Sequence, residues 1–282
     1  MPELPEVENI RIGLEKYLEG HSIKRIKVLN RRIFQGDEKK LIDTKFESAE
    51  RFGKMIAINF NNGFSLLTHV KLTGQFIYRG PNLPKPPKLS RKVVGGLGGK
   101  HTHVIFHLSQ GGVLYYNDIR KFGWIKLVET KKIKNESVSK LGPEPLKDLT
   151  LNLFTKIISS SKRPVKAVLM DQSKISGVGN IYANDALWLS QIVPTRPSQS
   201  LSGEEIKTLY KAIKKVLRKG LKQGGASELA FVTPDGAEGK YQDHTLVYGR
   251  EGELCIRCKK AKIKKIFLSG RGTYFCPNCQ HD

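Results

Sequence analysis

The sequence predicts an α+β protein with a strand-rich first half, a helical second half and a cysteine-bearing hairpin at its end. Three observations predict this order. Short strand patterns separated by turn residues fill residues 23–129. Apolar stripes at helical spacing follow from residue 151 onward. The chain's four cysteines then lie between residues 255 and 279.

The first half is predicted to open with a helix over residues 5–18 and to continue as antiparallel strands. One face of this helix is apolar, through Val7, Ile10, Leu14 and Leu18. Strands are expected at 55–60, 64–69, 103–107 and 113–116, with turns at 61–63 and 110–112. Strands at this interval indicate a β-sandwich or a barrel, and the pattern leaves both open.

Two segments lack such patterns. Residues 80–99 contain four prolines, several cations and a glycine cluster, and we interpret them as a mobile basic loop. Residues 131–141 are rich in Lys, Asn, Glu and Ser and are predicted to be a hinge. The helical half follows, with an apolar stripe from Leu151 to Ile158 and a capping box of Ser202 and Glu205 before a long helix.

The cysteines predict a structural zinc site. They form two CxxC pairs separated by 17 residues: Cys255 and Cys258, then Cys276 and Cys279. Each pair makes a tight turn, and two such turns close a tetrahedral shell of four thiolates around one Zn²⁺. Disulfides are the weaker alternative, because we see no signal peptide. The intervening segment is basic and carries a glycine-flanked Arg271, which is typical of a finger that contacts nucleic acid.

The charge of the chain points to a polyanionic partner. The formal net charge is +23 and the pI is about 9.9, so the surface field concentrates polyanions. A membrane is the rival partner, but no apolar run of about 18 residues and no lipidation motif is present. We therefore expect a cytoplasmic protein. At 282 residues, about two domains plus the zinc appendage are expected.

With these elements placed, the chain resembles the bacterial formamidopyrimidine-DNA glycosylases, which are zinc-finger enzymes of base-excision repair. The resemblance rests on motifs in a shared order, at residues 2–7, 69–74, 118–123, 141–145, 177–182, 246–249 and 270–276. It implies an N-terminal β-sandwich, a helical domain with a helix–two-turns–helix, and the zinc finger. The domains would be 1–130 (catalytic sandwich with its helix), 131–141 (hinge), 142–240 (helical) and 241–282 (finger).

The resemblance implies a bifunctional glycosylase and abasic-site lyase whose nucleophile is Pro2, once Met1 is removed. An α-amino group has a pKa of about 7.7–8, so part of it is neutral near pH 7, and its attack on a sugar leaves a Schiff base. Glu3 matches the family's general acid/base and Glu6 its supporting carboxylate. The alternatives are that Pro2 only starts a helix and that both carboxylates only favour its N-terminus.

Other positions match family residues that contact DNA. Lys54 would bind phosphate at the lesion, although an exposed lysine more often only adds solubility. Further DNA-binding positions implied by the resemblance are His69, His103, Lys166, Asn180 and Arg271. The gap left by an extruded base would be filled by three side chains: Leu72, Arg120 and Phe122. Leu72 stands where methionine is usual, and the alternative for Phe122 is a core aromatic.

Two departures from the family concern the substrate. The 80–99 loop is longer than the family's stretch, and the segment after Gly225 carries Glu228 and Leu229 where many members have hydroxyls and a basic residue. The resemblance implies damaged duplex DNA as the partner of a monomer, with oxidised and ring-opened purines as the lesions. The departure after Gly225 concerns recognition of the damaged purine and not the lyase chemistry at Pro2. One rival function is an endonuclease VIII-type glycosylase for oxidised pyrimidines. The other is a DNA-binding protein without catalysis.

Overall fold

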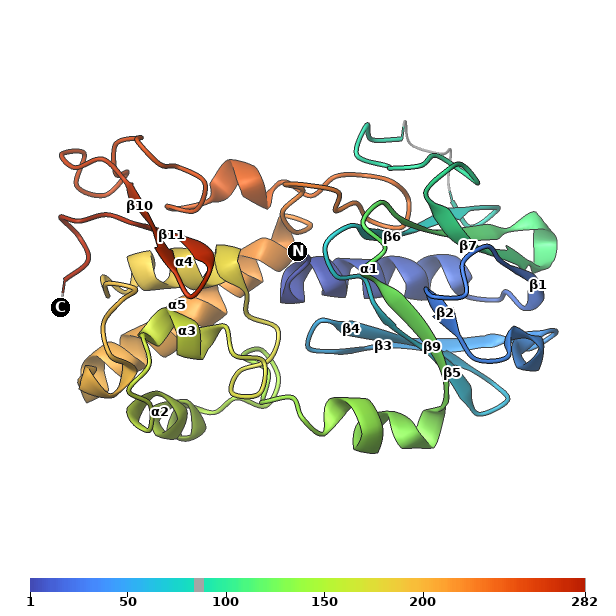
Figure 1. Cartoon of the computed structure of the whole chain (residues 1–282), viewed down its shortest axis with the longest axis horizontal. Coiled ribbons are helices and arrows are strands. Elements are labelled where there is room, and N and C mark those ends of the chain that lie inside the picture. The colour runs from blue at the N-terminus through green and yellow to red at the C-terminus, as the bar shows by residue number, and fades with distance from the viewer. Residues whose placement is uncertain (84–88, 282) are drawn as a thin grey trace. The chain divides into compact units, whose positions relative to one another are not determined.

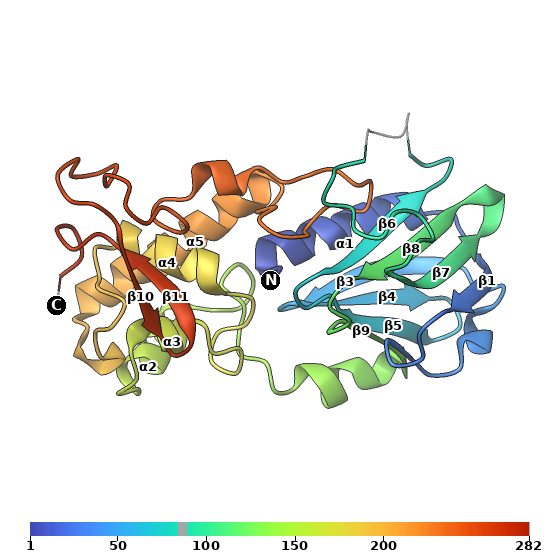
Figure 2. The same cartoon turned by 45° about the horizontal axis from the view of Figure 1, so that its top comes forward.

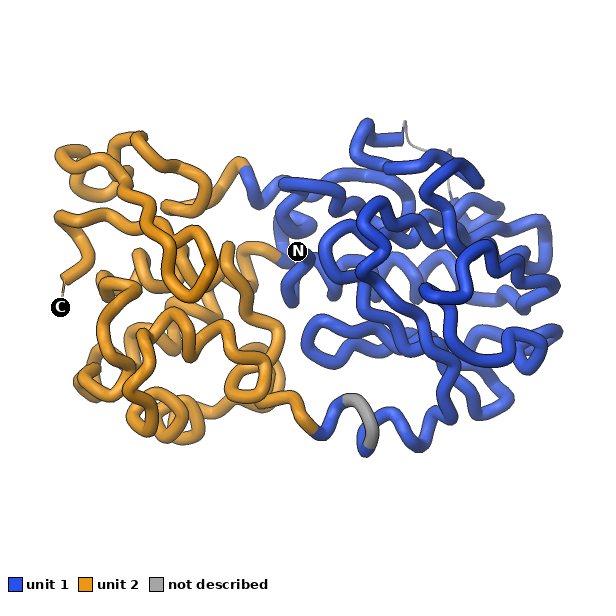
Figure 3. The backbone as a smooth tube through the Cα atoms, viewed as in Figure 1, with its two compact units in different colours: residues 1–139, 221–242 blue, residues 140–220, 243–282 orange. Residues whose placement is uncertain are grey.

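The computed structural model describes residues 1–83 and 89–281, and the chain divides into two compact units (Figure 3). The first unit comprises residues 1–139 and 221–242; the second comprises residues 140–220 and 243–282. The predicted boundaries place 221–240 in the helical domain, whereas in this division the segment groups with the strands. Backbone bonds explain the grouping, since Pro234 accepts from the N–H of Tyr78 at 2.7 Å.

The described strands of the first unit form two stacked sheets (Figures 1 and 2). The four-stranded sheet has the order β1 (Ile23–Val28), β7 (Thr102–Leu108), β8 (Val113–Asp118), β6 (Gly74–Arg79). The five-stranded sheet has the order β2 (Phe34–Gln35), β9 (Trp124–Glu129), β5 (Phe64–His69), β4 (Met55–Phe60), β3 (Phe46–Phe52). Both sheets contribute to one apolar core, as Leu66 and Phe106 illustrate. The fold is therefore a sandwich, which confirms the expectation.

Pairing between the described strands of these two sheets is antiparallel with one exception. Ile58 faces Leu66 across β4 and β5, and Phe106 faces Leu114 across β7 and β8, as the predicted hairpins require. The exception is β2, which runs parallel to β9. A two-residue strand shows no alternation that a sequence pattern could reveal.

Helix α1 (Leu4–Leu18) forms as predicted, and its apolar face packs into the core of the sandwich. Val7, Ile10, Leu14 and Leu18 are all buried in the core. The helix is fixed to β3 by polar contacts, since Glu15 accepts a bond of 2.6 Å from the backbone N–H at position 49. The C-terminal half of α1 is thereby held against the sheet.

The second unit is helical and ends in a two-stranded hairpin. Its elements are α2 (Leu151–Ser159), α3 (Val165–Leu169), α4 (Asn180–Leu189), α5 (Gly203–Lys222), β10 (Lys264–Leu268) and β11 (Arg271–Phe275). Phe154 and Ile158 of the predicted stripe are fully buried. The capping box is present: Ser202 N–H donates to Glu205 at 2.7 Å, and Glu205 N–H donates to Ser202 Oγ at 3.3 Å.

Short helical turns fill several connections. They are η1 (Glu38–Leu41), η2 (Ser109–Gly111), η3 (Thr130–Lys132), η4 (Lys134–Val138), η5 (Ser198–Ser200) and η6 (Tyr241–His244). The predicted hinge at 131–141 thus contains helical turns. The described part of 80–99 has no helix or strand, as expected, and residues 84–88 lie outside the described residues. None of the helices that the structure describes has the length and apolarity needed to cross a membrane.

Candidate functional site

The N-terminal residues form a buried polar cluster at the start of α1. Pro2 is buried, and Glu3 and Glu6 are 2% and 1% exposed. One carboxylate oxygen of Glu6 accepts from the N–H of Glu3 at 2.8 Å, and the other accepts from the N–H of Ala226 at 2.7 Å. Glu6 therefore joins the residue after Pro2 to the loop that follows α5.

Gly225 lets that loop approach the carboxylate closely. Its φ is +84°, and a Cβ there would lie 2.9 Å from Cγ of Glu6. Both the backbone conformation and the space exclude a larger residue. The loop after α5 is thus built to lie against the N-terminal cluster, which the sequence pattern did not reveal.

Lys54 lies on the β3–β4 turn, at the end of the sandwich where α1 begins. Arg51 joins the two, because its Nε donates to Glu8 of α1 at 2.7 Å and its Nη1 donates to the carbonyl of Gly53 at 3.0 Å. Lys54 itself is only 6% exposed. It is therefore a positioned lysine rather than one of the solvated surface lysines.

His69 ends β5 as a neutral imidazole. Burial, followed by the positive charges of Lys71 and Lys54, lowers the pKa of His69 to about 3. Its Nδ1 accepts from the N–H of Lys71 at 3.0 Å, so the ring proton is on Nε2. A neutral ring with one N–H can donate to a phosphate oxygen, whose charge would raise the pKa of the ring.

Stability should therefore fall as the solution is acidified from about pH 6.5 toward pH 3. The unfolded His69 takes up a proton near pH 6.5, whereas the folded one does so only near its pKa of about 3. Within this window the unfolded state binds more protons, so stability is lost as pH decreases. His69→Gln keeps an N–H donor without the titration. The free energy of unfolding, measured in urea at several pH values across this range, should therefore depend less steeply on pH in the variant than in the parent. An equal dependence on pH in both proteins would contradict the assignment.

The three predicted gap-filling residues lie on two joined loops of the first unit. Leu72 is half-buried, and Phe122 is 54% exposed with the Arg120 guanidinium 4.8 Å from its ring centre. The loops are joined because the Thr73 hydroxyl donates to the Asp118 carboxylate and also accepts from the N–H of Arg120 at 3.1 Å. An exposed Phe122 does not fit the alternative of a core aromatic.

Asp118 organises the second loop, although its motif alone gave it no role. Its carboxylate is fully buried and accepts from the N–H of Arg120 at 3.1 Å and of Gly123 at 2.8 Å. His103, also buried, donates from Nε2 to the Asp118 carbonyl at 2.7 Å. The structure thus places His103 beneath the loop, and a direct DNA contact of His103 stays a prediction.

Phe122→Ala should slow single-turnover action on a lesion in duplex DNA by about tenfold to a hundredfold. The reason is that unstacking a base costs a few kcal/mol, which a wedge offsets. Cleavage of a single-stranded abasic site needs no wedge and should change by less than about threefold. Ile119→Ala, at an exposed apolar residue of the same loop, is the matched control. Equal losses on both substrates would assign Phe122 to packing.

In the second unit, Lys166 and Asn180 converge on the hairpin. Lys166 of α3 is 1% exposed, and its Nζ donates to the carbonyl of Gly272 at 3.0 Å and to the hydroxyl of Thr273 at 2.7 Å. Asn180, the first residue of α4, donates to the same Gly272 carbonyl at 3.0 Å. Both side chains thereby hold the strand that begins with Arg271.

Arg271 is presented by a tight turn beside a basic pocket. Ser269 and Gly270 have φ of 49° and 71°, the signature of a two-residue hairpin turn with positive φ at both central positions. A pocket of about 190 Å³ lies between α3 and this hairpin and includes Arg163, Lys166 and Arg271 in its wall. Arg163, which sequence reasoning missed, is paired with Asp171 at 2.7 Å.

The four cysteines fit a zinc ion. Their Sγ atoms all lie within 4.8 Å of one another, and the pairs 255–279 and 258–276 are each 3.8 Å apart. Four sulfurs about 2.3 Å from one tetrahedral Zn²⁺ lie about 3.8 Å apart, whereas a disulfide needs about 2.05 Å. Backbone N–H groups of Ala261 and Lys260 also lower the pKa of Cys258 to about 6. The predicted zinc site is confirmed and the disulfide alternative is excluded.

Helix α4 holds the finger to the helical unit. Trp188 donates from Nε1 to Sγ of Cys255 at 3.4 Å, and Asn184 accepts from the N–H of Tyr274 at 2.9 Å. The buried Asp185 accepts from three successive N–H groups, those of residues 246–248. The motif at 246–249 is therefore the turn that docks on α4 through Asp185. The sequence alone does not show this role, because the contact depends on the folded positions of the turn and the helix.

The fold and the thiolate site define a zinc-finger protein of the helix–two-turns–helix class. Residues 1–125 match the model of the formamidopyrimidine-DNA glycosylase N-terminal domain, residues 141–231 match the model of the formamidopyrimidine-DNA glycosylase H2TH domain, and residues 252–281 match the zinc finger found in FPG and IleRS. The formamidopyrimidine-DNA glycosylase of Lactiplantibacillus plantarum is 40% identical over 285 residues, or 98% of each chain. That of Streptococcus pneumoniae is 36% identical over 286 residues, or 99% of each chain.

Solved structures give the same result. Wild-type Lactococcus lactis Fpg (MutM) bound to DNA with an oxidised pyrimidine has a TM-score of 0.86 and 34% identity, covering 100% of both chains. The same protein bound to FAPY-dG DNA also has a TM-score of 0.86 and 34% identity, covering 99% of this chain and 100% of that one. The chain belongs to the formamidopyrimidine-DNA glycosylase family.

Proposed function

We propose that this protein removes oxidised and ring-opened purines from duplex DNA and then cleaves the abasic site. The observation that carries the proposal is the buried cluster of Pro2, Glu3 and Glu6, in which Glu6 is fixed by two N–H donors. Family membership and the net charge of +23 support a DNA substrate. We further propose that the protein acts as a monomer on chromosomal DNA in the cytosol.

The reaction starts at the Pro2 nitrogen after Met1 has been removed. The secondary amine attacks C1′ of the damaged nucleotide, the bond from C1′ to the base breaks, and the base departs with the bonding electrons and a proton. Loss of the nitrogen's proton and opening of the sugar ring give an iminium. This cation acidifies the C2′ proton, and removal of that proton expels the 3′ phosphate. Loss of a second proton, from C4′ of the unsaturated iminium, then expels the 5′ phosphate. Hydrolysis frees Pro2.

The carboxylates have different tasks in this proposal. Glu3 is adjacent to the amine and exchanges protons with the sugar ring oxygen and with C2′. Glu6 has both oxygens engaged by backbone N–H groups, so it holds Glu3 and the loop after α5 in place. Lys54, His69, Lys166, Asn180 and Arg271 bind phosphates, while Leu72, Arg120 and Phe122 fill the gap.

The rival functions predict different chemistry. A DNA-binding protein without catalysis would form no borohydride-trapped complex with abasic DNA. An endonuclease VIII-type enzyme would prefer oxidised pyrimidines, and the structure of Lactococcus lactis Fpg with an oxidised pyrimidine makes such lesions a necessary comparison. In the resemblance to the family, two features favour the purine-acting branch over the endonuclease VIII type. They are Leu4 and the division of the gap-filling residues between two loops.

The substrate range should separate abasic sites from 8-oxoguanine. Lyase chemistry needs Pro2, the carboxylates and the phosphate contacts, whereas base recognition also needs the loop after Gly225. There Glu228 is exposed and Leu229 is 62% exposed, and a carboxylate near an extruded base flanked by phosphates is unfavourable unless it points outward or pairs with a cation. We expect rapid abasic cleavage and slower excision of 8-oxoguanine than of formamidopyrimidines, measured by single-turnover cleavage opposite cytosine. Cleavage of 8-oxoguanine as fast as of the abasic site would overturn this interpretation.

A further inference from the structure

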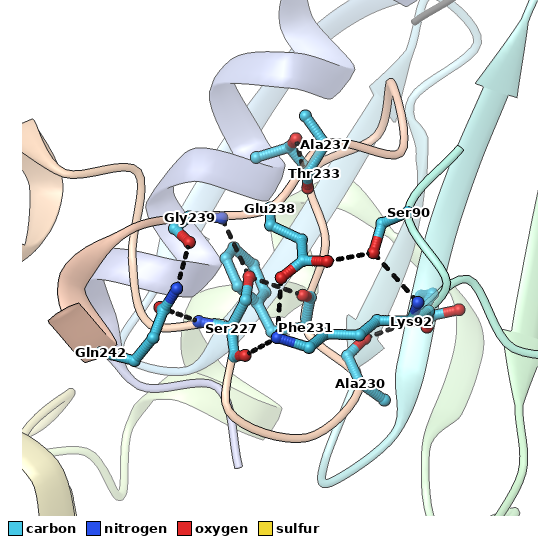
Figure 4. A network of polar contacts seen from close by, with 11 residues as sticks. Ser90, Lys92, Ser227, Ala230, Phe231, Thr233, Ala237, Glu238, Gly239 and Gln242 are labelled. Atoms are coloured by element: carbon cyan, nitrogen blue, oxygen red, sulfur yellow. Dashed lines mark hydrogen bonds and ion pairs between the residues drawn. The ribbon is translucent and has the colours of Figure 1, made fainter. Parts of the chain in front are cut away.

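The loop that follows Gly225 is held by a segment of the long 80–99 insertion. Figure 4 shows the contacts, which join residues 90–92 to residues 227–239. The central group is the Lys92 ammonium, which bonds at once to the Glu238 carboxylate at 2.7 Å and to the Ser227 carbonyl. One lysine of the insertion therefore holds both ends of the loop.

Neighbouring contacts make this a built arrangement. The Ser90 hydroxyl donates to the other oxygen of Glu238, and the Ser90 N–H donates to the Gly236 carbonyl at 3.2 Å. Gln75 of β6 is buried, with 1% of its surface exposed. Its side-chain amide donates to the carbonyl of Lys92 at 2.7 Å and also to the carbonyl of Ala230. The insertion and the loop are thus anchored to the same buried amide of the sandwich.

The held residues form the tip nearest the N-terminal cluster. Ala226 bonds to Glu6, and Leu229, three residues later, is 62% exposed between the buried Ala226 and Ala230. Three extended residues span at most about 10 Å. An extruded base whose sugar is attached to Pro2 therefore lies within reach of this tip, whereas an abasic site offers no base to meet it.

We propose that Lys92 is a positioning residue that fixes the 227–230 tip for the base-excision step and is dispensable for abasic-site cleavage. Ala226 stays in place without it, because Glu6 holds its N–H and the adjacent Gly225 carbonyl accepts from the N–H of Tyr241 at 2.9 Å. The 80–99 insertion thereby tunes which damaged bases are removed. This inference rests on the proposed glycosylase function and deepens it.

The test compares two reactions in the full-length protein. Lys92→Met removes the ammonium and keeps an unbranched side chain of nearly the same length. Arg91→Met removes an equal charge from the exposed neighbouring residue, for which the described residues show no hydrogen bond or ion pair to the loop. We expect Lys92→Met to slow single-turnover excision of a formamidopyrimidine about tenfold, as for loss of a group that only orients. Its rates of abasic cleavage and of borohydride trapping should stay within about twofold of those of the parent. Arg91→Met should change both rates by less than about twofold.

A second variant separates positioning from general damage to the fold. Glu238→Gln should reproduce part of the excision loss, and the double variant should lose no more than Lys92→Met alone, because Lys92→Met already removes the contact with Glu238. Equal losses in both reactions, or an unchanged excision rate in Lys92→Met, would overturn the inference while leaving the proposed function intact. A parent protein that neither excises nor traps would instead overturn both.

Discussion

A protein that keeps Met1, or carries any residue before Pro2, is expected to lose base excision and abasic cleavage by about a thousandfold or more. The added peptide bond turns the Pro2 nitrogen into an amide, whose lone pair is delocalised and cannot attack C1′. Because Pro2 is buried beside Glu3 and Glu6, another nitrogen cannot simply take its position. Single-turnover cleavage of duplexes with a formamidopyrimidine or an abasic site measures the loss.

The control places the same short extension at the carboxyl terminus. That protein should cleave at the parent rate, and both extended proteins should bind abasic duplex within about threefold of the parent, since the phosphate contacts are unchanged. If the N-terminally extended protein cleaves normally, the nucleophile lies elsewhere.

Cys276→Ser is expected to abolish zinc binding and to weaken binding to abasic duplex by at least about tenfold. Cys276 is fully buried, with its sulfur 3.8 Å from that of Cys258, and structural zinc contributes about 10–16 kcal/mol of apparent binding energy in finger peptides. Without the metal the hairpin loosens, and Lys166 and Asn180 lose their shared partner, Gly272. Metal analysis and a binding titration measure the two effects.

Arg271→Ala separates the metal from the contact it presents. This variant should retain zinc, weaken DNA binding to a similar extent and reduce the slope of log affinity against log salt by about one unit. A metal-free Cys276→Ser protein that binds abasic duplex normally would remove the finger from the DNA-binding surface.

Local patterns predicted the elements whose residues are close in sequence. The face of α1, the hairpin strands β4–β5 and β7–β8, the capping box of α5 and the four thiolates all follow from spacing. The helix–two-turns–helix and the catalytic assignment of Pro2 came instead from the resemblance, because no periodicity encodes them.

The rest depends on contacts between distant residues. The loop after Gly225 joins the sandwich through Glu6, 220 positions earlier, and Lys92 meets Glu238 across 146 positions. Asp118 has a clear role only once the 118–123 loop has formed around it. The 80–99 segment was predicted to be mobile from its composition, yet its described residues Ser90 and Lys92 hold specific partners. Composition alone does not reveal such partners.

Borohydride trapping followed by peptide mapping tests the central assignment most directly. The protein without Met1 is incubated with duplex DNA containing an abasic site, reduced with borohydride, digested and analysed by mass spectrometry. The expected result is one covalent adduct on the N-terminal peptide, at Pro2, which the N-terminally extended protein does not form. An adduct on a lysine such as Lys54, or equal trapping by the extended protein, would contradict the proposal that the Pro2 amine performs the reaction.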